Sequence, residues 1–311
     1  MTKWGIFIGL LALLGGIFWG VNKNNQGLLS PLGEITEKTY EKYSFTRLAS
    51  SGGQGSRIEI AGNKFYYHSE GRRISGMVNP PSGQAKGIIV MARGYVEKAE
   101  YQTGTGTKNA AKYYSEHGYW TYAPDFSGYG ESDPEDSNAL GARLVKPVEI
   151  LDLIASLSGD LPIYLWGHSN GGQIMLSVAE ILGARGETRV KGVTLWAPVS
   201  KPFPYNILYY TDDASDSGKW LRGQVAQFEQ DYDVFNYSID RYWEWITLPI
   251  QIHQGTMDLA VPKIWSDQLV EKLLELDKTV KYYVYPGADH NLRPGWDQVV
   301  ARDDLFFTSL N

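Results

Sequence analysis

The chain has 311 residues, 43% of them hydrophobic, which is enough for one large core, and its formal net charge is −6. Basic residues are scattered and fewer than acidic ones, so the electrostatic footprint of a nucleic-acid-binding protein is missing and we expect no nucleic-acid partner. The absence of cysteine excludes thiol catalysis, cysteine zinc sites and disulfides, and without a metal-binding histidine spacing or a phosphate loop we predict neither metal nor cofactor.

The N-terminal segment Trp4–Val21 is uncharged and flanked by Lys3 and Lys23. At about 1.5 Å of rise per residue, a helix of this length spans about 27 Å, enough for a thin bilayer. We therefore expect residues 1–23 to form a single N-terminal membrane anchor, with the rest of the chain outside the cytoplasm. A cleaved signal and a secreted protein are the alternative, although Phe18–Val21 makes a poor cleavage site.

After a linker or stand-off over residues 24–56, with a short helix at Ile35–Leu48, strands and helices alternate. Strands are expected at Arg57–Ile60, Lys64–His68, Arg72–Val78, Gly87–Ala92, Trp120–Ala123, Leu161–Trp166, Val190–Trp196, Ile250–His253 and Val280–Tyr285, with helices at Lys108–His117, Pro147–Leu157 and Gln173–Leu182. This alternation predicts an α/β fold over residues 57–311, with a mostly parallel central sheet and helices on both faces.

The segment 201–247 interrupts the alternation and is dense in aromatic residues. It is expected to form a small cap, in which most of the rings pack against the core; the alternative is that they line a substrate pocket. As a hypothesis, the nearby acids Asp212, Asp213 and Asp216 favour cationic substrates.

The hexapeptide Gly167–Gly172 reads Gly-His-Ser-Asn-Gly-Gly and directly follows an expected strand. A Gly-x-Ser-x-Gly turn between strand and helix exposes the serine at the carboxyl edge of a sheet, where open α/β sheets keep their sites. The pattern is weak alone in a chain with 34 glycines. The surrounding strand and helix make Ser169 a candidate nucleophile, with a plain helix N-cap as the other interpretation.

The order of acid and histidine after the serine supports this interpretation. Asp258 and then His290 follow Ser169, each on the loop after an expected strand, and His290 is the last histidine of the chain. Asp258 also suits an ordinary turn, and Asp289 is a competing acid, although a residue adjacent to His290 is badly placed to orient its ring.

Three segments together carry a family resemblance: the Gly-x-Ser-x-Gly turn, Gly255–Pro262 with Asp258 inside it, and Pro286–His290. They resemble the α/β-hydrolase superfamily over about residues 72–310. Ser169-Asn170-Gly171-Gly172 and the tail Val280–Leu292 are most similar to the catalytic domain of prolyl oligopeptidase-type (S9) serine peptidases. The chain is also similar to bacterial carboxylesterases and lysophospholipases.

The resemblance implies a serine hydrolase that cleaves a small ester or a short peptide through an acyl-enzyme. Ser169 would attack, His290 would take its proton, and Asp258 would hold the imidazole in the productive tautomer. The segment before the core is too short for the β-propeller of full-length S9 peptidases, so an esterase is the alternative. A non-catalytic binding protein is disfavoured because the triad is complete. The oligomeric state is not predicted.

The expected oxyanion hole uses the N–H of Asn170 and a donor from Tyr95, on the loop after strand Gly87–Ala92. Tyr95 could donate through its backbone or, as the S9 resemblance implies, through its hydroxyl. Arg93 stands where many relatives have histidine, so its role is left open.

Overall fold

A computed structural model describes residues 38–211 and 214–310. Contacts divide the chain into Met1–Thr39 and a compact unit, Tyr40–Asn311. The described part of that unit contains nine strands in one sheet, in the order β1-β2-β3-β5-β4-β6-β7-β8-β9. The strands are β1 (Glu59–Ala61), β2 (Lys64–Ser69), β3 (Arg72–Asn79), β4 (Gly87–Ala92), β5 (Tyr119–Pro124), β6 (Ile163–His168), β7 (Val190–Trp196), β8 (Ile250–Gly255) and β9 (Val280–Tyr285).

The sheet is antiparallel only at one side. The pairs β1–β2, β2–β3 and β3–β5 are antiparallel, and the pairs from β5–β4 through β8–β9 are parallel. The expected strands agree with the observed ones to within about two residues at each end. Because parallel strands all end at the same edge, the loops after β4, β6, β8 and β9 meet there.

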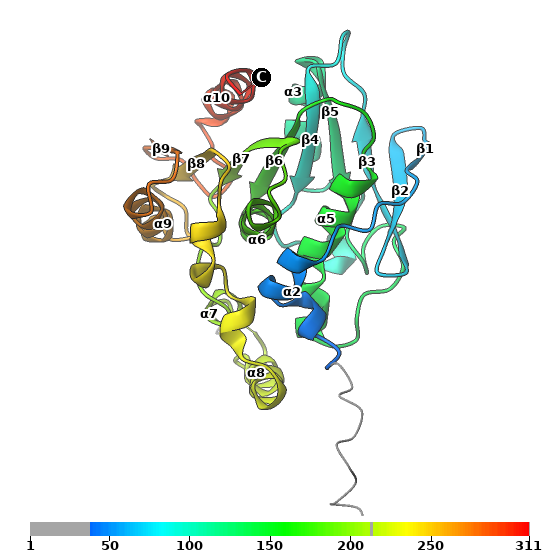
Figure 1. The fold of residues 1–311 in the computed structure, drawn as a ribbon. Helices are drawn as coiled ribbons and strands as arrows, with labels where there is room; N and C mark the ends of the chain where they lie inside the picture. The colour runs from blue at the N-terminus through cyan, green and yellow to red at the C-terminus, as the bar shows by residue number, and fades with distance from the viewer. Residues whose placement is uncertain (1–37, 212–213, 311) are drawn as a thin grey trace, which may run out of the picture. The chain divides into compact units, whose positions relative to one another are not determined.

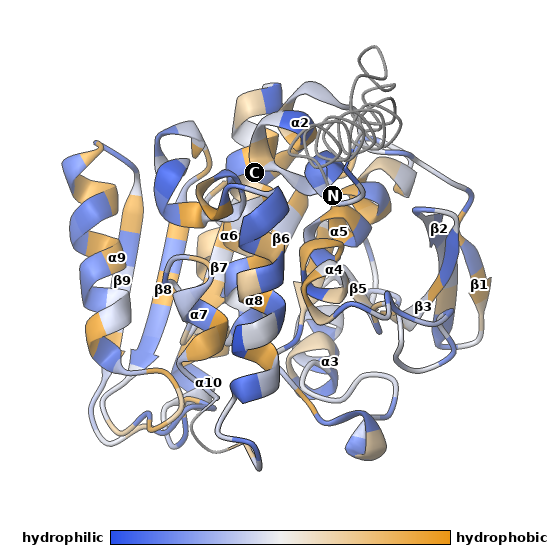
Figure 2. Ribbon diagram, turned by 90° about the horizontal axis from the view of Figure 1, so that it is seen from below, coloured by the Kyte–Doolittle hydropathy of each residue, from blue (hydrophilic) through white to orange (hydrophobic). Residues whose placement is uncertain are grey.

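Helices cover both faces of the sheet (Figure 1). The longer helices are α3 (Lys108–Glu116), α5 (Lys146–Ser156), α6 (Asn170–Arg185), α8 (Lys219–Asp231), α9 (Lys263–Glu275) and α10 (Trp296–Thr308). One buried cluster joins α5, α6 and α9 to the sheet, and a second joins α3 and α10 to it. In Figure 2, α8 and α9 are banded blue and orange, as expected for helices with one buried and one solvated face. The architecture confirms the predicted α/β-hydrolase fold.

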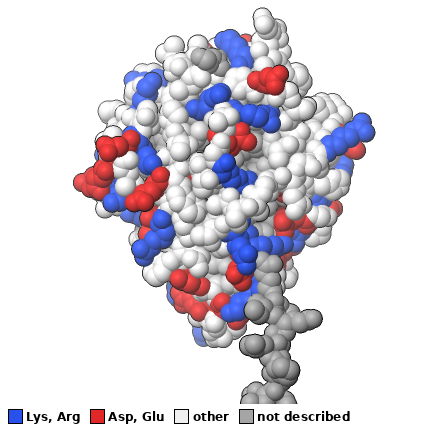
Figure 3. Space-filling model, in the orientation of Figure 1, with Lys and Arg blue, Asp and Glu red and all other residues white. Residues whose placement is uncertain are grey.

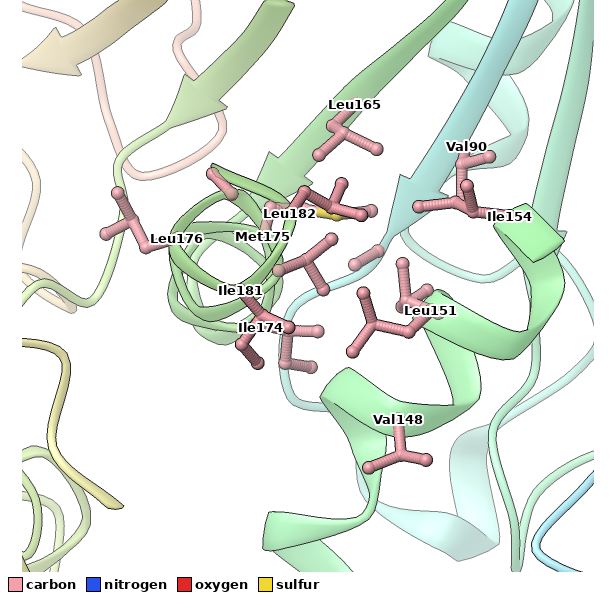
Figure 4. Packing of buried hydrophobic residues seen from close by; sticks show 14 of the residues in the cluster. Val90, Val148, Leu151, Ile154, Leu165, Ile174, Met175, Leu176, Ile181 and Leu182 are labelled. Carbon is pink, nitrogen blue, oxygen red and sulfur yellow. The ribbon is translucent and has the colours of Figure 1, made fainter. Parts of the chain in front are cut away.

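The core between α5, α6 and the sheet consists of interlocked aliphatic side chains (Figure 4). Val90 of β4 and Leu165 of β6 point toward Leu151 of α5 and Met175 of α6, and all four are at most 2% exposed. Burying a side chain of this size stabilises a fold by about 1.5–3 kcal/mol. This packing holds β6 and α6 rigidly on either side of Ser169.

The segment before β1 belongs to the core rather than to a stand-off. Here α2 (Phe45–Ser50) packs on α6, with Phe45 and Leu48 buried. Arg185 of α6 donates from Nε and Nη2 to the Leu48 carbonyl at 2.9 and 2.6 Å. The expectation of a linker over the whole of residues 24–56 is therefore corrected, because the apolar side chains of α2 are covered by α6 instead of facing water.

The prediction of a membrane-anchored protein is also corrected. Across residues 38–211 and 214–310, no helix has the length and apolar character needed to cross a bilayer. The segment Trp4–Val21, on which that prediction depended, lies outside the described residues.

The expected cap is built from short helices between β7 and β8: α7 (Tyr205–Leu208), α8 and three 3-10 turns, Val234–Tyr237, Ile239–Arg241 and Trp243–Trp245. Phe203, Phe228 and Tyr237 are buried, in line with rings that pack the cap onto the core. Asp216 accepts hydrogen bonds from the N–H groups of Gly218 and Trp220, so it caps α8. Asp212 and Asp213 lie outside the described residues.

Candidate active site

Ser169 lies at the sharp turn between β6 and α6, with φ 57° and ψ −121°. Such positive φ values are uncommon outside glycine, and here the neighbouring backbone imposes the strain. A Cβ on Gly167 would lie 2.6 Å from the Gly171 carbonyl oxygen, and one on Gly171 would overlap the Ala92 carbonyl. The two glycines of the motif are therefore required by close backbone contacts, and the serine is lifted out of the strand.

Asp258 and His290, from the loops after β8 and β9, form a hydrogen-bonded pair. His290 Nδ1 lies 2.9 Å from Asp258 Oδ2. Asp258 Oδ1 accepts the N–H groups of Ala260 and Val261 at 2.9 and 2.8 Å. Gln254 Nε2 donates to Oδ2 at 3.0 Å. Burial raises the pKa of Asp258, but the hydrogen bonds from His290 and Val261 outweigh it, so the pKa lies below its usual value.

The loop of His290 is tied to the residue before the serine. The ring of His168 lies 4.6 Å from that of His290, and its Nε2 donates to the His290 carbonyl at 2.9 Å. Burial, followed by the charge of His290, lowers the pKa of His168 to about 4, so this donor is neutral at physiological pH. Among the described residues, Ser169 Oγ has no hydrogen-bond partner, and its bond to His290 is not formed here; such bonds are often long without substrate.

The loop after β4 lies directly against the serine. A Cβ on Gly94 would lie 3.0 Å from Ser169 Cβ and 3.5 Å from its Oγ. The Tyr95 hydroxyl donates to Glu97 Oε1 at 2.6 Å, and its side chain is 60% exposed. The hydroxyl of Tyr95 is therefore already occupied, whereas its backbone belongs to the loop beside the serine, and Asn170 is the first residue of α6.

Arg93 is buried beneath the loop that follows β4 and holds it in place. Its guanidinium is 4.4 Å from the ring centre of Tyr101 and 4.1 Å from that of Tyr129. It donates to the carbonyls of Gly94 and Asp125 at 2.9 and 3.2 Å. Cation–π contacts of this kind contribute about 0.5–2 kcal/mol each. The side chain that departs from the common pattern is thus a buried brace for Gly94, a role the sequence alone left open.

A cavity lies on the α5–α6 side of the serine turn. It is lined by Tyr43, Phe45, Leu48, Arg143, Leu144, Lys146, Pro147, Asn170, Gln173, Ile174, Ser177, Ile181, Phe203, Asn206, Ile207 and Tyr237. Sequence reasoning missed the contributions of α2, of Arg143 and of Lys146. The apolar residues within Tyr43–Leu48 were the available signal. Within residues 38–211 and 214–310, no group of His, Asp and Glu gathers as a metal site would require.

Comparison with known proteins shows which family this chain is similar to. Residues 83–232 match the family model Hydrolase_4, described as serine aminopeptidase, S33. Human protein ABHD12B is 24% identical over 210 residues, which cover 66% of this chain and 56% of that protein. Lysophosphatidylserine lipase ABHD12 of Xenopus tropicalis is 29% identical over 104 residues, 32% of this chain and 26% of that protein. The chain thus spans about half, or less, of these relatives.

Among solved structures, Est1E from Butyrivibrio proteoclasticus with bound ferulic acid has a TM-score of 0.57 at 19% identity. The match covers 79% of this chain and 98% of that one, and at this identity it shows the fold alone. Fold, serine turn and family model agree with one another. The chain therefore has the α/β-hydrolase fold, and its residues 83–232 are similar to the serine aminopeptidase S33 family of that fold.

Proposed function

We propose that the protein is a serine hydrolase that cleaves carboxylic esters, with Ser169 as nucleophile, His290 as general base and acid, and Asp258 as the group that orients His290. The observation that carries the proposal is the hydrogen bond between His290 Nδ1 and Asp258 Oδ2, at 2.9 Å, beside the strained serine turn. When the N–H at Nδ1 of His290 donates to Asp258, Nε2 of the neutral ring carries no hydrogen and can accept a proton.

In the proposed reaction, Ser169 Oγ attacks the ester carbonyl carbon while His290 Nε2 takes the hydroxyl proton. The tetrahedral oxyanion accepts hydrogen bonds from the N–H groups of Asn170 and Tyr95. Each such donor typically contributes about 3–4 kcal/mol to the transition state. As the carbon–oxygen bond breaks, His290 returns the proton to the departing alcohol and the acyl group stays on Ser169. A water molecule, deprotonated by His290, then attacks the carbonyl carbon of the acyl-enzyme. The bond to Ser169 Oγ breaks, His290 returns the proton to Ser169, and the carboxylic acid is released.

Peptide-bond cleavage is the second candidate, because the matching family model is described as a serine aminopeptidase and the sequence resembles S9 peptidases. An aminopeptidase must hold the α-ammonium group of its substrate, for which a carboxylate is the usual partner. The cavity beside Asn170 is lined by Arg143 and Lys146 and, among the described residues, by no carboxylate. This charge favours the ester over the aminopeptidase substrate.

Labelling with a fluorophosphonate probe tests the proposal. Wild type is expected to react, and Ser169→Ala is expected not to. A panel of p-nitrophenyl esters and aminoacyl p-nitroanilides then separates the two candidates, and we expect turnover of the esters. Equal labelling of wild type and Ser169→Ala would refute the nucleophile. Faster turnover of the anilides would replace the esterase by the peptidase.

A further inference from the structure

The cavity beside Asn170 combines an apolar wall with two cationic side chains. We propose that it binds an amphiphilic anion, with Arg143 and Lys146 holding a carboxylate or phosphate group and the apolar wall holding a hydrocarbon chain. The substrate of the proposed hydrolase would then be an ester that carries an anionic group. Only the statement about the substrate rests on the proposed function, because binding of the anion to the cavity requires no catalysis.

The apolar wall is formed by elements far apart in the sequence. Phe45 and Leu48 come from α2, Ile174 and Ile181 from α6, and Ile207 from α7. In Figure 1, α2 lies beside α6, and the contacts between the two helices agree. Asn170, the first residue after Ser169, lines the same cavity. A hydrocarbon chain bound here would therefore extend from the serine toward α2.

The two cations in the cavity are not neutralised by the protein. Across residues 38–211 and 214–310, neither Arg143 nor Lys146 forms a hydrogen bond or an ion pair, and the contacts of Lys146 are with the rings of Phe126 and Tyr129, 5.9 and 5.8 Å from its Nζ. A buried charge without an anionic partner is unfavourable, so a bound anion would stabilise both side chains. On the face shown in Figure 3, by contrast, basic and acidic side chains are interspersed.

The acids nearest to these cations have other partners. Glu135 forms an ion pair with Lys98. Both oxygens of Glu149 accept the N–H of Ser127, at 3.3 and 3.2 Å, and burial raises the pKa of Glu149 to about 7. Glu149 is therefore only partly charged at neutral pH and neutralises Lys146 incompletely.

A third cation, Arg93, contacts the ring of Tyr129, as Lys146 does, and adds to the positive potential. Burial, aided by the charges of Arg143 and Arg93, lowers the pKa of Lys146 to about 8. Arg143 is also close enough to the loop after β4 for its charge to oppose the rise in the pKa of Tyr95. Arg143 and Lys146 thus line the same cavity as Asn170, the residue after Ser169, so an anionic group held by them can belong to a substrate whose carbonyl is at Ser169.

This assignment replaces the hypothesis of cationic substrates. Asp216 is occupied as a helix cap, and Asp212 and Asp213 lie outside the described residues. A substrate cation in the cavity would meet Arg143 and Lys146 and no carboxylate among the described residues.

Binding to the full chain carrying Ser169→Ala tests the proposal without catalysis. Isothermal titration calorimetry at pH 7 would compare hexanoate, hexyl phosphate and neutral 1-hexanol. We expect at least one of the anions to bind about tenfold or more tightly than hexanol, and their ranking distinguishes a carboxylate from a phosphate site. Arg143→Gln and Lys146→Gln should each lower anion affinity about tenfold and leave hexanol unchanged.

Two further variants separate charge from damage to the fold. Arg143→Lys keeps the charge and should retain most of the anion affinity, and Lys112→Gln removes an exposed lysine on α3 and should change nothing. Equal binding of hexanol and both anions, or unchanged anion binding in both Gln variants, would overturn the proposal. If fluorophosphonate still labels Ser169 in wild type in that case, the hydrolase function stands and only the anionic substrate is rejected.

Discussion

Replacing Asp258 by asparagine is the sharpest test of the proposed triad, because the surroundings dictate how the amide must lie. Two N–H groups, from Ala260 and Val261, point at Oδ1 at 2.9 and 2.8 Å. An asparagine would keep its carbonyl oxygen there, since those donors need an acceptor. Its NH₂ group would then face His290 Nδ1, at the position where Oδ2 now accepts a hydrogen bond.

An NH₂ group at that position forces His290 into the tautomer with hydrogen on Nε2, which cannot accept the proton of Ser169. In a serine protease triad, the equivalent change lowers kcat by about 10⁴. At about 1.36 kcal/mol per tenfold, this corresponds to about 5.4 kcal/mol of transition-state stabilisation. We expect Asp258→Asn to lower kcat for p-nitrophenyl ester hydrolysis by about 10³- to 10⁴-fold.

Asp289→Asn is the matched control, because Asp289 also lies beside His290. Its Oδ1 accepts only the N–H groups of Asn291 and Arg293, at 2.9 and 3.0 Å, and an asparagine oxygen can accept both. Activity should fall by less than about tenfold. Comparable losses in the two variants, or Asp258→Asn within about tenfold of wild type, would refute the assignment of Asp258. Circular dichroism and the melting temperature would show that both variants are folded.

Three further predictions concern stability and the loop beside the serine. Gly171→Ala should lower the free energy of unfolding by about 3 kcal/mol or more, measured in urea, because the new methyl group overlaps the Ala92 carbonyl. Gly223→Ala on α8, with no atom near its Cβ, should instead raise it by up to about 1 kcal/mol, and equal effects would contradict this. Because burial lowers the pKa of His168 to about 4, the stability that it contributes is complete above about pH 6.5 and decreases as the pH falls toward 4. The melting temperature of wild type should therefore fall more steeply over this range than that of His168→Asn, and parallel curves would argue against a neutral buried histidine. Arg93→Lys should lower kcat/KM for esters by about tenfold, since lysine cannot both contact two rings and bond two carbonyls; unchanged kinetics would show that the brace is dispensable.

Much of the site could be predicted from local sequence. The apolar run before Gly167 and the helical spacing after it indicated a strand and a helix, and these are β6 and α6. Asp258 and His290 were found by their order in the chain and their positions after β8 and β9. Their hydrogen bond is consistent with that prediction, although their catalytic roles remain to be tested.

Contacts between residues far apart in the chain could not be predicted from local sequence patterns. The range 24–56, expected to be a linker, contains α2, whose Phe45 and Leu48 are buried and which packs on α6. Arg93 stood out in the sequence only as a departure from the common pattern. Its position between the rings of Tyr101 and Tyr129 became visible only when the structure brought the loops after β4 and β5 together. In the sequence, nothing distinguished Arg143 and Lys146 from ordinary basic residues of a helical segment.

The alternation of strands and helices, the tight turn at Ser169 and the chain order of the candidate triad are all legible in the amino-acid sequence. These properties depend on backbone preferences and on periodicity within a few residues, which each segment carries on its own. Which side chains share the cavity beside Asn170, and which cations there have no hydrogen-bonded anionic partner among the described residues, follows from the three-dimensional fold. Those facts depend on how the parallel sheet brings its loops to one edge and on the packing of α2 against α6, and no local pattern encodes either.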